Sequence, residues 1–338
     1  MKKSSILFIL TCLSLLLFIS NSGAQAPVPL ERISIRGNKF VNESGETVIF
    51  HGVNIQDPHD LDRSGHWNLD HFREAKSWGA NVIRLPVHPR SWRNRGEEST
   101  LQLLDLAVQW AKELNLYLIL DWHSIGNLKE EKYQSSGYIT TLEETSHFWN
   151  VVSKRYAGEP AVAMFELYNE PTVSGDRFGK MTWNEWKKIN EELIRTIRTN
   201  HPGSVILVAG FDWAYDLTPI RSNPIDAEGI AYVSHPYPEK RKAPWEGQWE
   251  KDWGYVAQTY PVILTEIGFA LPDERGVHVP VHGDETYGKV LVDFCSERGI
   301  SWVVWCFSPE WPPLMFTDWN YTPTRQGTFF RKVMKGEL

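Results

Sequence analysis

Eight short apolar runs recur along the chain, and helical patterns lie between most of them. The runs are Val48–Val53, Asn81–Val87, Leu116–Trp122, Ala163–Tyr168, Val205–Ala209, Ile230–Ser234, Val262–Ile267 and Trp302–Phe307. The helical patterns are Leu69–Trp78, Leu101–Leu114, Leu142–Tyr156, Trp183–Thr199, Trp245–Thr259 and Tyr287–Arg298. Strands that alternate with helices pair in parallel, and eight such units over about 300 residues favour a (β/α)8 barrel.

The start of the chain supports a barrel over an open sheet. An open, doubly wound sheet usually has a glycine-rich phosphate-binding turn after its first strand. Here that position reads His51-Gly52-Val53-Asn54, which is no such turn. The segments Ile33–Phe40 and Thr47–Val53, with a turn signal at Gly37-Asn38, predict a short N-terminal β-hairpin. No low-complexity linker follows, so we expect residues 28–338 to form a single α/β TIM-barrel domain.

The first residues have the layout of a secretory signal peptide. Met1-Lys2-Lys3 is a positive start, Ile6 to Ile19 is an apolar run, and small residues follow up to Ala24. This layout predicts a signal peptide over residues 1–24 that is cleaved after Ala24. The mature chain would then be secreted, either extracellular or periplasmic. The apolar run is short for a membrane span. A retained anchor and a lipoprotein attached through Cys12 are the alternatives, and we expect no membrane span after processing.

Composition and charge exclude several classes of function. The net charge is −7 with both signs mixed along the chain, so no basic stripe is available for nucleic acid. His51, His59, His66 and His88 lack the HxH or HExxH spacing of a metal site. No GxSxG elbow of a serine esterase is present. We therefore expect no metal, no cofactor and no nucleic-acid partner, and a monomeric chain.

Two cysteines, Cys295 and Cys306, remain after removal of a signal peptide. Two cysteines make no disulfide scaffold, and no CxxC motif indicates a structural zinc. Cys295 lies in the helical pattern before the eighth run and Cys306 near the end of that run, so we expect their heights along the barrel to differ. We predict two free, buried thiols, with a bridge as the alternative.

Functional side chains lie at the ends of nearly all the apolar runs. In a (β/α)8 barrel the carboxyl ends of the strands form the active-site face. The residues at these ends are Asn54, Arg84, His123, Asn169, Glu170, His235, Tyr237, Glu266 and Trp305. Their convergence on one rim predicts a functional site there.

Two of these residues are carboxylates, Glu170 after the fourth run and Glu266 in the seventh. A retaining glycosidase needs two carboxyl groups about 5 Å apart, one as nucleophile and one as acid/base. The fourth and seventh strands face each other across a barrel, so inward side chains from their ends can meet. For either glutamate alone, a buried ion pair is the alternative. Glu166 shares strand parity with Glu170 but lies one layer lower, so we assign it a buried pairing role.

The strand-end motifs resemble those of glycoside hydrolase family 5, the cellulase family of clan A. The matching pieces are Arg84-Leu85-Pro86-Val87, Asp121-Trp122-His123, Leu167-Tyr168-Asn169-Glu170-Pro171, His235-Pro236-Tyr237, Leu264-Thr265-Glu266-Ile267-Gly268 and Trp302-Val303-Val304-Trp305. They follow in family order, one per strand end, over nearly the whole mature chain. The resemblance implies Glu170 as acid/base and Glu266 as nucleophile, held and kept ionised by Tyr237 and Arg84. Glu170, facing that negative charge, should have a raised proton affinity.

The resemblance also implies contacts to the substrate. Asn169 would bond the sugar 2-hydroxyl, and His123 and His235 would contact the sugar or the carboxylates. Trp305 would form the platform under the sugar at the cleavage point. We assign Asn54, at the end of the first run, to substrate binding as well.

The 16 tryptophans of the chain can stack on sugar faces or pack between helices and strands. Trp245, Trp249 and Trp253 are four apart on one helical face, which favours helix packing. Trp213, which follows the fifth run, is a candidate for a sugar subsite.

These features predict a retaining endo-β-1,4-glucanase of cellulase type that cleaves soluble or amorphous β-glucan through a covalent glycosyl-enzyme. A cleft built from Trp213, Trp305 and the loop carrying Trp311 and Trp319 would bind the polysaccharide. A β-mannanase or xyloglucanase on the same scaffold is the alternative, because fold resemblance does not decide the substrate. A non-catalytic carbohydrate-binding protein is the alternative of a different class, and the presence of both carboxylates argues against it.

Overall fold

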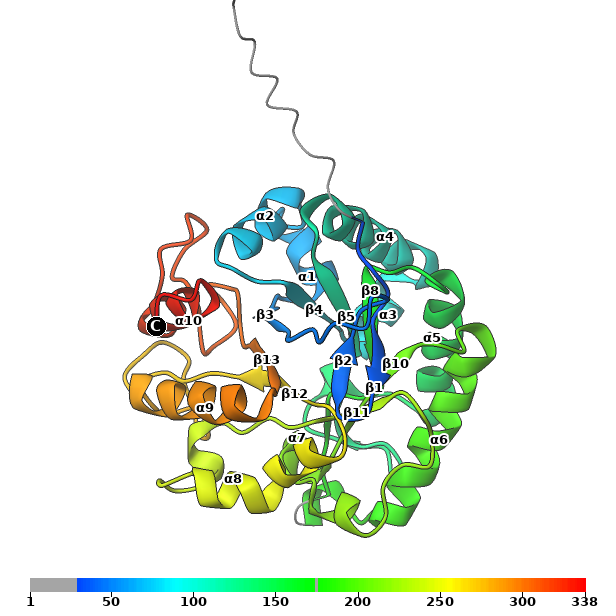
Figure 1. The fold of residues 1–338 in the computed structure, drawn as a ribbon. Coiled ribbons are helices and arrows are strands. Elements are labelled where there is room, and N and C mark those ends of the chain that lie inside the picture. Colours follow the sequence, from blue (N-terminus) through cyan, green and yellow to red (C-terminus); the bar gives the residue numbers. More distant parts are fainter. Residues whose placement is uncertain (1–28, 174–175) are drawn as a thin grey trace, which may run out of the picture.

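The computed structural model describes residues 29–173 and 176–338, with a closed barrel of parallel strands at its centre (Figure 1). The strands of the barrel are β3 (His51–Asn54), β4 (Val82–Val87), β5 (Tyr117–Trp122), β8 (Val162–Glu166), β10 (Val205–Ala209), β11 (Ile230–Val233), β12 (Val262–Ile267) and β13 (Ser301–Val304). They are arranged in sequence order, and β13 closes the barrel by pairing with β3. The predicted (β/α)8 barrel is confirmed.

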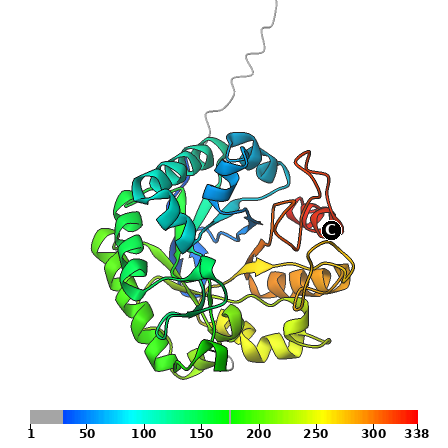
Figure 2. The same cartoon turned by 180° about the vertical axis from the view of Figure 1, so that it is seen from behind.

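Helices cover the outside of the barrel, as the view from behind also shows (Figure 2). They are α1 (Pro58–Arg63), α2 (Leu69–Ser77), α3 (Pro89–Arg95), α4 (Glu97–Leu114), α5 (Leu142–Arg155), α6 (Trp183–Asn200), α8 (Glu246–Asp252), α9 (Glu285–Arg298) and α10 (Arg325–Met334). The four residues labelled α7 (Phe211–Ala214) form a turn with non-helical backbone angles after β10. Short 3-10 turns are η1 (Ser136–Tyr138), η2 (Asp176–Phe178), η3 (Thr218–Arg221), η4 (Pro238–Lys240) and η5 (Gly254–Gln258). Side-chain caps mark several starts: at α6, Thr182 and Glu185 form a capping box.

The pattern that predicted one helix over Trp245–Thr259 forms two elements, α8 and η5. Gly254 lies at the break because the chain there approaches α9 closely: a Cβ on Gly254 would lie 2.7 Å from the ring of Phe294. Trp249 and Trp253 are nonetheless buried, and Trp245 stacks on Trp249. The predicted packing role of these tryptophans is confirmed.

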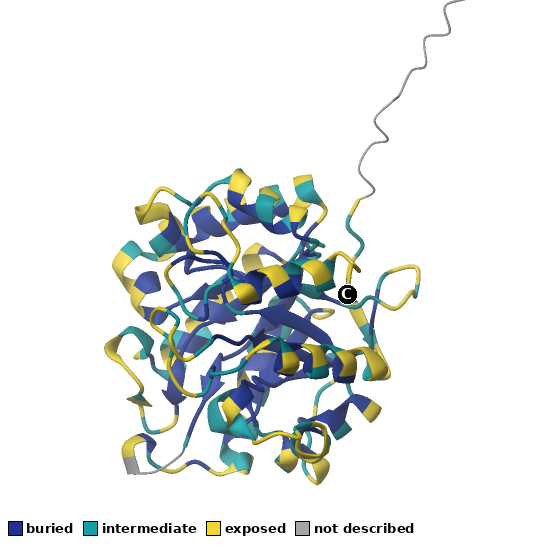
Figure 3. Cartoon of the chain, turned by 90° about the vertical axis from the view of Figure 1, so that its left-hand side faces the viewer, coloured by how far each residue is buried: buried dark blue, intermediate teal, exposed yellow. Residues whose placement is uncertain are grey.

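The predicted N-terminal hairpin consists of β1 (Ser34–Arg36) and β2 (Lys39–Val41), joined at Gly37 with a φ of +60°. Ile33 and Phe40 join a core cluster that contains the inward-facing strand residues of the barrel. A larger cluster lies between the strands and the helices. Figure 3 shows the strands buried inside and the outer helix faces exposed.

A small sheet at the rim of the barrel was not predicted. It consists of β6 (Ile125–Asn127), β7 (Lys132–Tyr133) and β9 (Glu170–Pro171), in the order β7-β6-β9. β6 pairs with β9 in parallel, with Ile125 opposite Glu170. The backbone of Glu170 is therefore held by pairing with β6, which lies in the loop that follows β5.

Cys295 and Cys306 are both buried and unpaired, which confirms the prediction of two free thiols. In the part of the chain that the structure describes, no helix has the length and apolar character needed to cross a membrane. The predicted signal peptide over residues 1–24 lies outside the described residues.

Candidate active site

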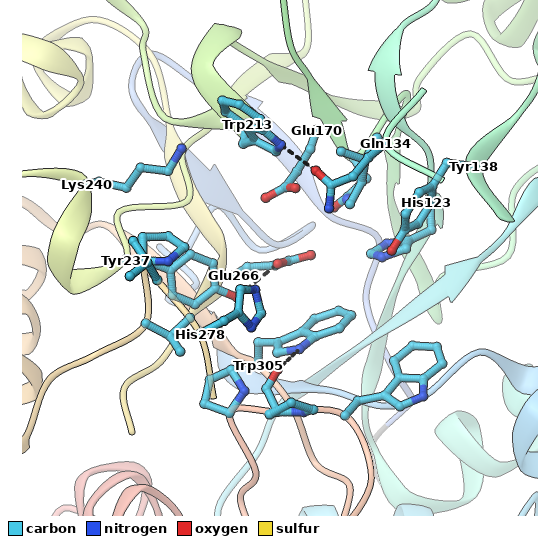
Figure 4. Close-up of a pocket in the computed structure, with 18 of the residues that line it drawn as sticks. His123, Gln134, Tyr138, Glu170, Trp213, Tyr237, Lys240, Glu266, His278 and Trp305 are labelled. Atoms are coloured by element: carbon cyan, nitrogen blue, oxygen red, sulfur yellow. Dashed lines mark hydrogen bonds between the residues drawn. The ribbon is translucent and has the colours of Figure 1, made fainter. Parts of the chain in front are cut away.

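A cleft of about 610 Å³ lies at the carboxyl ends of the barrel strands (Figure 4). Six of the predicted site residues line it together with Trp213: His123, Asn169, Glu170, Tyr237, Glu266 and Trp305. They come from the ends of β5, β8, β11, β12 and β13, and barrel closure brings them together. Both glutamates are nearly buried, with Glu170 8% and Glu266 5% exposed.

The two carboxylates lie close together with His235 beside them. One ligand atom each of Glu170, His235 and Glu266 lies within 4.8 Å of the others. Among the residues that the structure describes, this is the one group with the spacing of a metal site. Its atoms take part in hydrogen bonds with protein groups, since His235 Nδ1 lies 3.0 Å from Glu170 Oε1 and Tyr237 bonds Glu266.

Glu266 is held from two sides. The Tyr237 hydroxyl donates to its Oε2 at 3.0 Å, and Arg84 Nη1 donates to its Oε1 at 3.1 Å. Burial raises the pKa of Glu266 above its ordinary value of 4.5, and the Arg84 charge and the Tyr237 hydrogen bond oppose that rise. The predicted partners are in place, but burial outweighs them, so the pKa of Glu266 lies above 4.5 rather than below it.

Glu170 has its pKa raised to about 7. Burial is the main cause. The positive charges of Lys240 and Arg84 lower the pKa, and the negative charges of Asp212 and Glu166 raise it. The sequence predicted this direction with the charge of Glu266 as its cause. The direction is confirmed, but the cause is burial, and the repulsion between the two carboxylates instead raises the pKa of Glu266.

Arg84 is fully buried beneath the cleft and ties the site together. Its Nε and Nη2 donate to both oxygens of Glu166 at 2.7 and 2.9 Å, and Nη2 also donates to Asn169 Oδ1 at 2.7 Å. Asp121 Oδ2 lies 3.0 Å from Nη2. The buried pairing role predicted for Glu166 is therefore present, because a buried guanidinium needs carboxylate partners.

Three predicted substrate-binding residues lie under the cleft and do not line it: Asn54, Arg84 and His235. Asn54 is fully buried; its Oδ1 accepts from Arg84, and its Nδ2 donates to the Thr265 carbonyl at 2.8 Å. The strand end was predicted correctly, but its depth puts the side chain out of reach of a substrate. The assignment of Asn54 to substrate contact is wrong, since its amide is used to orient Arg84.

Asn169 and His123 both line the cleft, and buried partners orient their side chains. With Oδ1 bonded to Arg84, the Nδ2 donor of Asn169 is buried and has no hydrogen-bond partner among the described residues. His123 Nδ1 lies 2.6 Å from Asp121 Oδ2, which orients the ring. The His123 ring lies parallel to Trp305, with centroids 5.4 Å apart.

Aromatic rings form the walls of the cleft. Trp305 and Trp311 lie nearly parallel with centroids 5.8 Å apart, and Trp213 lies at the opposite side, above Glu170 (Figure 4). Trp319 does not reach the cleft, because it stacks on His66 at 3.6 Å in an outer aromatic cluster. The predicted contribution of Trp319 to the cleft is therefore wrong.

Trp213 stands on a left-handed turn after β10. The consecutive residues Asp212, Trp213 and Ala214 have φ values of 58°, 53° and 58°. This conformation costs an L-residue roughly 1–2 kcal/mol each, so the surroundings must hold it. Lys240 Nζ donates to the Asp212 carbonyl at 2.6 Å and lies 4.9 Å from the centre of the Trp213 ring, and Gln134 accepts from the indole N–H at 2.8 Å.

Comparison with known proteins identifies the family of this chain. The model of the family described as cellulase (glycosyl hydrolase family 5) matches residues 41–310. The chain belongs to glycosyl hydrolase family 5. It is 47% identical to a β-glucanase of Saccharophagus degradans, with a TM-score of 0.89 and coverage of 90% of this chain and 93% of that one. The same β-glucanase has also been solved in complex with cellotetraose.

Two curated proteins named endoglucanase match along a similar stretch. Endoglucanase N of Pectobacterium atrosepticum is 25% identical over 293 residues, which cover 85% of this chain and 60% of that protein. Endoglucanase A of Evansella cellulosilytica is 27% identical over 311 residues, covering 90% of this chain and 59% of that protein. The chain therefore spans about three fifths of the length of these two curated relatives.

The sequence patterns do not indicate several residues that line this family 5 cleft: Gln134, Tyr138, Lys240, His278 and His88, of which His88 is considered above only as a metal ligand. His88 directly follows β4, and its Nδ1 lies 2.9 Å from Asp57. Because residues that follow barrel strands lie on the active-site face, the position of His88 after β4 could have indicated a place in the cleft. The others lie in rim loops, where the sequence has no periodicity to place a side chain.

Proposed function

We propose that this chain is a retaining endo-β-1,4-glucanase. The observation that carries the proposal is the spacing of the two carboxylates, whose nearest oxygens lie within 4.8 Å of each other. Retaining glycosidases place their carboxyl groups about 5–5.5 Å apart, whereas inverting ones need about 6.5–9.5 Å to admit a water molecule. The relatives named endoglucanase and β-glucanase support the same activity.

In this mechanism Glu170 is the acid and Glu266 the nucleophile. Glu170 gives its proton to the glycosidic oxygen while an oxygen of Glu266 bonds the anomeric carbon, and the aglycone leaves as an alcohol. Water then attacks the glycosyl-enzyme, and Glu170 takes the proton of that water. A pKa of about 7 suits both tasks at neutral pH. Once Glu266 is esterified its charge is gone, which favours the ionised form of Glu170 that the second step needs.

The polar groups of the cleft fit a glucan in this mechanism. The free Nδ2 donor of Asn169 would bond the sugar 2-hydroxyl beside the anomeric carbon. The parallel rings of Trp305 and Trp311 would stack on successive sugar faces, and Trp213 would receive the sugar on the side of Glu170. The cellotetraose complex of the Saccharophagus β-glucanase supports a β-1,4-linked substrate.

We also propose how the chain is processed, where it acts and in which oligomeric state. Residues 1–24 would be a signal peptide cleaved after Ala24, and residues 28–338 a single catalytic domain that is secreted and acts as a monomer. N-terminal sequencing of the protein from culture medium and light scattering of the purified chain test these points.

The substrate is tested by release of reducing sugar from carboxymethylcellulose, mixed-linkage glucan, mannan and xyloglucan. We expect β-glucans to be cleaved fastest, with viscosity falling well ahead of reducing-sugar release, and weak action on crystalline cellulose. Faster cleavage of mannan or xyloglucan would reassign the substrate. Release of one disaccharide with nearly unchanged viscosity would indicate an exo-acting enzyme. An α-configured first product, observed by NMR, would exclude retention.

A further inference from the structure

A buried line of hydrogen bonds connects Arg84 to the acid/base carboxyl. Arg84 donates to both oxygens of Glu166, and the Thr265 hydroxyl donates to Glu166 Oε1 at 2.9 Å. Thr265 Oγ1 also lies 2.9 Å from His235 Nε2, and His235 Nδ1 lies 3.0 Å from Glu170 Oε1. Glu166, Thr265 and His235 are fully buried, so no solvent competes for these bonds.

The chemistry of the groups decides which atom donates the proton in each of these hydrogen bonds. The Thr265 hydroxyl has one proton, and Glu166 offers only acceptors to it, so that proton points to Glu166. The Thr265 oxygen then accepts, and His235 must donate to it from Nε2. Burial lowers the pKa of His235 to about 4, so the ring is neutral near pH 7 and has a single N–H. With that N–H on Nε2, Nδ1 presents a lone pair to Glu170.

We propose that Thr265 is a positioning residue that fixes His235 in its Nε2–H tautomer, so that the imidazole lone pair faces Glu170 and favours its protonated form. This rests on the proposed function, in which Glu170 is the acid/base. A protonated Glu170 donates a hydrogen bond to Nδ1, whereas an ionised one meets a lone pair 3.0 Å away. After Glu170 has given up its proton, the same contact favours its taking one from the incoming water.

The other charges around Glu170 act alongside this hydrogen bond. Lys240 and Arg84 stabilise the ionised form, while Asp212 and Glu166 oppose it. Groups that respond to the charge of Glu170 are Glu266, Asp121, Tyr138, Tyr237 and Lys240. None of these charges changes when the Thr265 hydroxyl is removed, so a hydroxyl deletion isolates the tautomer.

The first test compares Thr265→Val with Thr265→Ser. Valine keeps the shape of threonine but cannot accept from Nε2, so His235 is free to move its proton to Nδ1 and donate to ionised Glu170. The alkaline limb of kcat/KM on a cello-oligosaccharide should then move down by about one to two pH units, as expected for a hydrogen bond to a charged group. Thr265→Ser should restore the wild-type limb. Thr100→Val, which removes a buried hydroxyl in α4, is the matched control and should leave the limb unchanged.

The second test observes the tautomer without activity. Ring nitrogen shifts of ¹⁵N-histidine, with the His235 signals identified by their loss in His235→Gln, should show Nε2–H in the wild type and Nδ1–H in Thr265→Val. A wild-type ring with Nδ1–H overturns the proposal, as does a Thr265→Val protein that folds with the tautomer and alkaline limb unchanged. If the tautomers are as expected but no glycan is cleaved, the proposed function fails and the positioning role stands.

Discussion

Replacing Glu170 with Gln should stabilise the fold at alkaline pH while abolishing its acid function. The folded-state pKa of Glu170 is about 7, against an ordinary value of 4.5. Folded protein therefore holds this proton more tightly than unfolded protein. Below pH 4.5 both states are protonated and the group has no effect, and between 4.5 and 7 the unfolded state loses its proton first, so stability falls as pH rises.

The size of the effect follows from the two pKa values. At about 1.4 kcal/mol per pH unit, the gap between 4.5 and about 7 corresponds to a loss of about 3 kcal/mol, complete above pH 7. Glutamine is neutral at every pH and nearly the same size, and its amide can donate to His235 Nδ1 as a protonated carboxyl does. The Glu170→Gln chain should avoid this loss.

Urea unfolding followed by tryptophan fluorescence at pH 4.5, 6, 7 and 8 measures the difference. The unfolding free energy of Glu170→Gln minus that of the wild type should grow by about 3 kcal/mol from pH 4.5 to pH 8, or roughly 4–8 °C in melting temperature. Glu297→Gln, an exposed glutamate on α9, is the control and should follow the wild type. A difference that is constant with pH, or that shrinks as pH rises, would refute the reasoning.

Other outcomes follow from the same site. Glu266→Ala should abolish formation of the glycosyl-enzyme, whereas Glu170→Ala should keep activity on aryl glycosides with good leaving groups and yield a β-azide with added azide; product NMR distinguishes these results. In the wild type, kcat/KM should fall above about pH 7 as Glu170 loses its proton and fall on the acid side as Glu266 gains one, at a pH above 4.5. An alkaline limb that persists in Glu170→Ala with an activated substrate would assign the proton to another group. Arg84→Ala should lower the unfolding free energy by about 3–5 kcal/mol at pH 7, because it leaves three buried carboxylates without their cation, and by less at acid pH, as thermal melts will show. Trp311→Ala should raise KM for cello-oligosaccharides about tenfold, the equivalent of about 1.4 kcal/mol of lost stacking, and Trp319→Ala should leave KM unchanged.

The barrel and its carboxylate pair were predictable because they depend on local order along the chain. The runs Val205–Ala209 and Val262–Ile267 coincide with β10 and β12. Strands buried on both faces are nearly continuous apolar runs, so their ends are sharply marked by the first polar residue. Those polar residues are on the active-site face of any (β/α)8 barrel, which is how Glu170 and Glu266 could be found without coordinates.

The depth of each side chain and its electrostatic surroundings were decided only by the tertiary structure. Asn54 ends β3 and Asn169 comes shortly after β8, yet Asn54 is buried against Arg84 and Asn169 lines the cleft. Lys240 meets Asp212 and Trp213 only because neighbouring βα loops fold over the same rim. Such contacts join residues far apart in the chain, and burial, which raises the pKa of Glu170, depends on all the elements that exclude water from it. No local pattern encodes that exclusion, because it is a property of the closed barrel and its loops together.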